Sequence, residues 1–145
     1  LRERQLKLLN SFTPEELATI PAGFKNNILW NIAHCVVTQQ LYCYANSDLP
    51  TYLSDDFIAK YRKGTVPDGH IPTAAEIEEV RNLMFSTLDH LEADYAKGIF
   101  KHYNHYLTGI EYPLTNIDEA IYFNISHEGV HLGSVLALKC AIAKK

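Results

Sequence analysis

Residues 73–98 read TAAEIEEVRNLMFSTLDHLEADYAKG, and this stretch decides the fold class. Thr73 followed three residues later by Glu76 is a capping box, the pattern with which many helices begin. Apolar residues then recur at helical spacing and form one stripe: Ile77, Met84, Leu88, Leu91 and Tyr95. Gly98 ends the pattern. The stretch therefore predicts one long amphipathic helix that packs through a single face.

The segments around this helix also have helical patterns. Helices are expected at 1–12, 26–45 and 115–142, with Thr115 or Asn116 as the cap of the last one. A short helical turn is expected after Thr13, and a short helix at 54–61. Strand patterns are weak, and two long connections, 49–72 and 99–113, flank the helix at 73–98. We therefore predict one all-α domain over residues 1–145, a compact four-helix bundle.

Composition narrows the function classes. The chain has 145 residues, with 13 Lys and Arg against 17 Asp and Glu. Because phosphate binding needs clustered cations, this acidic chain without a basic stripe is not expected to bind nucleic acid. No apolar stretch is long enough to cross a bilayer, and the first residues lack the apolar core of a secretory signal, so no membrane association is expected. Three cysteines without a paired motif indicate reduced thiols and a cytoplasmic location.

A pair of histidines stands in the middle of the last predicted helix. Residues 127–131 read HEGVH, and side chains four positions apart lie about 40° apart around a helix. His127 and His131 can therefore reach one divalent ion, or they can simply pack side by side. The pattern also matches the HExxH motif of zinc proteases. That class is not favoured, because position 137 is alanine and no acidic residue follows His131.

A third metal ligand has to come from another segment. His34 lies on the face of the second predicted helix that also carries Trp30, which faces inward. A polar side chain on a buried face needs a partner, because an unpaired polar group costs about 1–3 kcal/mol. His70 and His90 lie in a loop and on a polar helix face, where we expect solvated surface.

The two long connections are candidates for the rim of a pocket. The connection at 99–113 contains His102 and His105, which could reach the mouth of a site. Tyr103 and Tyr106 of the same segment could form aromatic walls or donate hydroxyl hydrogen bonds, or could serve ordinary packing. The sequence leaves the roles of these four residues open.

Glu128, between the two histidines, is expected to face the apolar interior. Acids are rarely buried without a partner, so three roles are open. Glu128 could orient a ligand imidazole through its second nitrogen. It could act as a general base, which makes it the candidate catalytic residue. It could also pair with an Asn, Tyr or Lys of a neighbouring helix for structure alone.

Two stretches resemble a known family. Residues 27–34 read NILWNIAH and residues 127–135 read HEGVHLGSV, about ninety residues further on, and the turn at 12–17 reads FTPEEL. This combination resembles the DinB/YfiT-like superfamily of metal-dependent enzymes. The resemblance implies an up-down-down-up bundle and a divalent metal held by His34, His127 and His131. It also implies a thiol S-transferase that uses a low-molecular-weight thiol, or a hydrolase-like or isomerase-like enzyme, often as a homodimer.

Three neutral imidazoles would leave a divalent ion its full charge and an open coordination position. Such an ion can activate a water for hydrolysis or a substrate thiol for transfer. Nitrogen donors suit zinc or nickel, with iron as a further candidate. We therefore expect a metal-dependent transferase or hydrolase acting on a small molecule. The alternatives are a bundle that binds or senses a metal without catalysis, and a fold whose histidines bind nothing.

Overall fold

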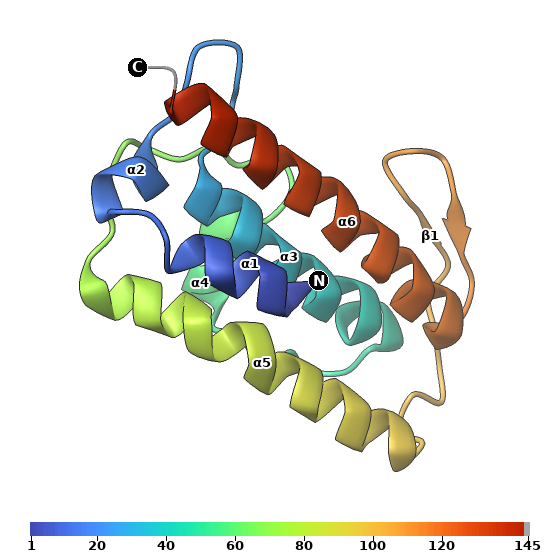
Figure 1. Ribbon diagram of the computed structural model, residues 1–145. Coiled ribbons are helices and arrows are strands. Elements are labelled where there is room, and N and C mark those ends of the chain that lie inside the picture. Colours follow the sequence, from blue (N-terminus) through green and yellow to red (C-terminus); the bar gives the residue numbers. More distant parts are fainter. Residues whose placement is uncertain (144–145) are drawn as a thin grey trace.

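The computed structural model describes residues 1–143, which are mostly helical (Figure 1). This confirms the all-α prediction. Within these residues the helices are α1 (Arg2–Leu9), α2 (Pro14–Ala18), α3 (Ile28–Cys43), α4 (Asp55–Tyr61), α5 (Ala74–Ala96) and α6 (Ile117–Ile142), with a 3-10 turn, η1, at Ala45–Ser47. Two short strands, β1 (Tyr106–Leu107) and β2 (Pro113–Leu114), pair antiparallel.

The helices begin at the caps that the sequence predicts. The side chains of Thr13 and Thr73 each accept a hydrogen bond from the backbone N–H three residues on. The side chain of the glutamate at that position accepts one from the backbone N–H of the threonine, so both capping boxes are complete. The Asn116 side chain accepts from the backbone N–H of Glu119 at the start of α6. The second predicted helix begins two residues later than expected, at Ile28, because Asn27 is its cap and accepts from Trp30.

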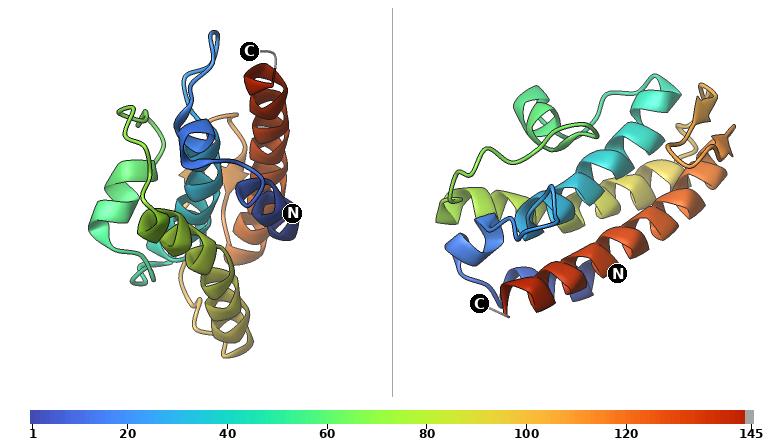
Figure 2. Two further views of the ribbon diagram at one scale, coloured as in Figure 1. Left: turned by 60° about the vertical axis from the view of Figure 1, so that its left-hand side comes forward. Right: turned by 90° about the horizontal axis from the view of Figure 1, so that it is seen from above.

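Helix α3 is the central element of the fold. It contacts α1, α2, α4, α5 and α6, and Figure 2 shows the other helices arranged around it. Every residue from Ile28 to Gln40 is buried. Such a helix carries its polar side chains into the interior, where they must find hydrogen-bond partners. The candidate site is built from these side chains.

Two details differ from the sequence-based expectation. The first helix ends at Leu9, three residues before Phe12. The aromatic segment at 99–113, predicted as a loop without strands, contains β1, and β1 pairs with β2 through Tyr106–Leu114 and Leu107–Pro113. Two-residue strands are too short to produce the alternation of apolar and polar residues by which strands are recognised. The predicted short helix at 54–61 is present as α4.

The three cysteines are free. Cys35 and Cys43 are buried, and burial raises the pKa of each thiol to about 12. Cys140 is exposed near the end of α6. Among residues 1–143, no helix has both the length and the apolar character that a bilayer span requires.

Candidate metal centre

Three histidines from two helices come together in the interior. His34 lies on α3, and His127 and His131 lie one turn apart on the face of α6 that packs against α3. One nitrogen of each imidazole lies within 4.8 Å of the others. The ring centroids are 5.2 Å apart for His34 and His127, 4.8 Å for His34 and His131, and 4.5 Å for His127 and His131. The three predicted ligands therefore form one cluster that is compatible with a metal ion.

The imidazole of His34 is oriented by a backbone carbonyl. Its Nδ1 lies 2.7 Å from the carbonyl oxygen of Tyr61, at the end of α4. A carbonyl oxygen only accepts, so Nδ1 carries the proton and Nε2 keeps its lone pair. The hydroxyl of Thr38 lies 3.2 Å from this Nε2. His34 therefore presents Nε2 as its donor atom for a metal.

The imidazole of His131 is oriented by an amide. Its Nδ1 lies 2.8 Å from Oδ1 of Asn31 on α3. Asn31 Nδ2 donates to the carbonyl of Asn27 at 2.8 Å, which turns Oδ1 toward His131. The Nδ1–H of His131 therefore donates to Asn31, and its Nε2 keeps the lone pair. Hydrogen bonds of this kind fix the tautomer of metal-binding histidines in many proteins.

His127 contributes a nitrogen without a partner. Its Nδ1 is buried and has no hydrogen-bond partner among the described residues. A buried polar atom left unpaired costs about 1–3 kcal/mol. An unsatisfied nitrogen beside two imidazoles with fixed tautomers is the arrangement expected where a further ligand binds. The cluster therefore fits a divalent ion by its donor chemistry.

The environment keeps all three imidazoles neutral. Burial, together with the neighbouring His131 and His34, lowers the pKa of His127 to about 3. Burial and the proximity of His34 lower the pKa of His131 to about 4. Burial also lowers the pKa of His34, against the hydrogen bond with Tyr61, which raises it. A metal binds the neutral form, so at neutral pH no proton has to leave before an ion can bind.

Trp30 fixes the long connection against the site. Its ring stacks on the His34 imidazole at 4.4 Å with an angle of 10°, and its Nε1 donates to the Thr65 hydroxyl at 2.9 Å. The Thr65 hydroxyl also lies 2.8 Å from the Arg62 carbonyl oxygen. Together with the bond between His34 and Tyr61, these contacts anchor residues 61–65 beside the histidine cluster.

A cavity of about 340 Å³ opens on one side of the cluster. Its walls come from α3, α6 and both long connections: His34, Thr38, Leu41, Tyr42, Ala45, Asn46, Arg62, Lys63, Tyr106 and His127. Segments 49–72 and 99–113 therefore both reach the cavity. Tyr106 lies in its wall, whereas Tyr103 is not among the lining residues and accepts a hydrogen bond from Asn46 at 3.3 Å.

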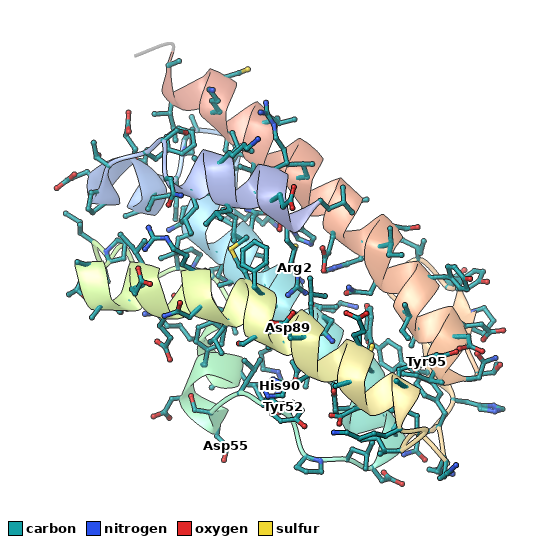
Figure 3. All side chains as sticks on the ribbon, turned by 60° about the horizontal axis from the view of Figure 1, so that its bottom comes forward. Arg2, Tyr52, Asp55, Asp89, His90 and Tyr95 are labelled. Carbon is teal, nitrogen blue, oxygen red and sulfur yellow. The ribbon has the colours of Figure 1, made fainter. Side chains whose placement is uncertain are left out.

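The other histidines lie at the surface, away from this cavity. His70 lies 2.9 Å from a carboxylate oxygen of Glu76, and His90 stacks on Tyr52 with ring centroids 3.8 Å apart (Figure 3). His102 and His105 are exposed and do not line the cavity. The expected surface positions of His70 and His90 are confirmed.

Glu128 is buried, as predicted, and it pairs with a residue that the sequence did not indicate. Its Oε1 accepts from Nε and Nη2 of Arg2 at 3.0 and 2.8 Å, and from Nδ2 of Asn124 at 2.9 Å. Nη1 of Arg2 donates to the Met84 carbonyl at 2.6 Å and to the Thr87 hydroxyl at 3.0 Å. Arg2 therefore joins α1 to α5 and α6 (Figure 3). These contacts favour the structural role of Glu128, and its catalytic role stays a prediction.

Fold and site together define a helical protein with a buried cluster of three histidines beside a cavity. The family model of the DinB superfamily matches residues 1–135, and the chain belongs to this superfamily. Neither the curated proteins nor the solved structures that were compared contain a match.

Proposed function

We propose that this protein is a metal-dependent enzyme that holds a divalent ion at His34, His127 and His131. It acts on a small molecule, by transfer of a low-molecular-weight thiol or by hydrolysis. The observation that carries the proposal is the cavity, because His34 and His127 both form part of its wall. Catalytic sites leave one side of the metal open to substrate, whereas structural sites are closed by a fourth protein ligand. Among the described residues, the cluster contains three potential ligands.

The metal in this proposal is zinc or nickel, with iron as a further candidate, because imidazole nitrogens suit all three. When bound, the ion would supply a Lewis acid with an open position. The chain would supply the orientation of the ligands. The carbonyl of Tyr61 accepts from Nδ1 of His34, and Oδ1 of Asn31 accepts from Nδ1 of His131. Each Nε2 atom therefore keeps its lone pair and points away from its hydrogen bond.

The nucleophile in this proposal comes from solution. No cysteine lines the cavity, and the thiols of Cys35 and Cys43 are buried and protonated. The attacking group is therefore a water or the thiol of a substrate. Tyr42 also lines the cavity, and burial, together with the nearby Tyr106, raises its pKa to about 12. Its phenol therefore stays protonated and can donate a hydrogen bond to a bound substrate.

The activity is tested on untagged protein of known metal content. One panel pairs the low-molecular-weight thiols of cells, bacillithiol and mycothiol among them, with electrophiles, and a second contains esters and amides. We expect turnover in one panel that is lost in His127→Ala and kept in His90→Ala, which removes an exposed histidine away from the cavity. Fully metallated protein that turns over nothing in either panel would contradict catalysis and favour metal binding or sensing.

We also propose the up-down-down-up arrangement for α1, α3, α5 and α6. The directions of the helices in Figure 1 support it, because α3 and α5 run one way and α1 and α6 run the other way. The reduced cysteines support a cytoplasmic location.

A homodimer is proposed as the assembly. Its support is the outer side of α6, where large apolar side chains are exposed: Tyr122, Ile125, Val130 and Leu136. Exposed apolar patches often mark interfaces. Light scattering should give twice the mass of one chain for the wild type and the mass of one chain for Ile125→Glu. A monomeric wild type would contradict the dimer.

A further inference from the structure

Two cations line a cavity that contains no carboxylate. Arg62 and Lys63 belong to its wall, and none of the other eight lining residues is Asp or Glu. This is unexpected for a chain in which acidic residues outnumber Lys and Arg by 17 to 13. The local charge of the cavity is therefore opposite to the net charge of the protein.

These two cations are not used by the ion pairs of the described residues. Four other cations of the described residues have carboxylate partners, namely Arg2, Lys60, Arg81 and Lys97. Arg62 and Lys63 have none within 4.0 Å, and both residues are exposed. Their charges are therefore available to a ligand.

The backbone that carries both cations is fixed beside the histidine cluster. The carbonyl of Tyr61, the residue before Arg62, accepts from His34, and Thr65 accepts from Trp30. The ammonium group of Lys63 reaches the turn between β1 and β2, where a Cβ added to Gly109 would lie 2.9 Å from Nζ. Lys63 therefore crosses the space between the two long connections at the edge of the cavity.

We propose that the substrate of this site carries an anionic group, a carboxylate or a phosphate, which binds to Arg62 and Lys63. The planar guanidinium can bind either group through two parallel hydrogen bonds, and the ammonium adds a point charge. The Asn46 amide and the hydroxyl groups of Thr38 and Tyr42 provide neutral hydrogen-bonding groups in the same wall. The substrate then extends toward His34 and His127, and its reactive end lies beside these two histidines. This orientation rests on the proposed function, whereas the anion site itself does not require a metal.

The test is a binding titration of the full chain, as purified and after chelation, with metal content measured in each sample. The probes are inorganic phosphate and succinate, with succinamide as the neutral counterpart of succinate. We compare the wild type with the double variant Arg62→Gln/Lys63→Gln. The matched control is Arg4→Gln/Lys139→Gln, which removes the same two charges from exposed positions outside the cavity. Circular dichroism checks that each variant is folded.

We expect the wild type and the control to bind phosphate or succinate more tightly than succinamide. The cavity variant should bind the anion about tenfold more weakly, as expected for the loss of two partly solvated charged hydrogen bonds. Preference for one of the two anions identifies the group. Equal affinities of wild type and cavity variant, or binding of succinamide as tight as that of succinate, would overturn the proposal. If the enzyme turns over a neutral substrate, and the cavity variant does so at the wild-type rate, the anion proposal is overturned and the proposed function stays intact. Anion binding by a wild-type chain that takes up no zinc, nickel or iron when these are supplied would contradict the proposed function and leave the anion site intact.

Discussion

The buried ion pair between Arg2 and Glu128 gives a sharp test of what the glutamate of the HEGVH stretch does. Their side chains are 3% and 6% exposed, and the charged groups are 2.8 Å apart. Glu128→Gln removes the negative charge and leaves the Arg2 guanidinium buried without a counter-ion. Breaking a buried pair in this way costs about 3–5 kcal/mol. This is a large part of the about 5–15 kcal/mol by which a domain of ordinary stability is folded.

The assay is urea unfolding of a double-mutant cycle: Glu128→Gln, Arg2→Met and the two together. Each single variant should lose about 3 kcal/mol of unfolding free energy, and the slope of the unfolding free energy against urea concentration should stay unchanged. The double variant should be clearly more stable than the sum of the single losses predicts, because no charge remains buried alone. Metal content should stay at the wild-type level in all three. A stable Glu128→Gln variant that has lost only activity would refute this reasoning and establish Glu128 as a catalytic or ligand-orienting residue.

Three further predictions concern the site and its surroundings. Asn31→Leu should weaken metal binding about 10–100-fold, measured by competition with a chelator, because His131 loses its hydrogen-bond acceptor; unchanged affinity would contradict the tautomer argument. In the metal-free protein the lowered pKa values of His127 and His131 should make folding pH-dependent, since the unfolded chain binds protons below about pH 6.5 and the folded chain only near about pH 3–4. The stability contributed by the neutral imidazoles is therefore complete above about pH 6.5 and is lost as the pH falls toward 4. Urea titrations at several pH values measure this, and a free energy of unfolding that stays constant across the range would contradict it. A thiol reagent should label Cys140 in the folded protein and all three cysteines after unfolding, and fast labelling of the two buried thiols would show that the interior opens.

The local features of the fold could be predicted from the sequence. Capping boxes are encoded within four residues, so Thr73 marks the start of α5 in both the sequence and the structure. The spacing of His127 and His131 is a property of one helix, and it predicts their common direction without any knowledge of the partner helix. His34 could be selected because a histidine on an inward face needs a partner.

Features that depend on distant contacts could not be predicted in the same way. Arg2 lies in the first helix, and its partner Glu128 is 126 positions away, so no local pattern indicates the pair. The bond between Asn31 and His131 spans 100 positions and depends on how α3 and α6 are aligned. The cations of the cavity lie in a connection without periodicity, and their position follows from the bonds of Tyr61 and Thr65.

The central claim is that His34, His127 and His131 hold one metal ion. The most direct measurement is elemental analysis of untagged protein, together with the variants His34→Ala, His127→Ala and His131→Ala and the surface control His90→Ala. The claim predicts about one divalent ion per chain in the wild type and the control, and background levels in the three cluster variants. Full metal content in any folded cluster variant, or a wild type that binds no zinc, nickel or iron when these are supplied, would contradict it.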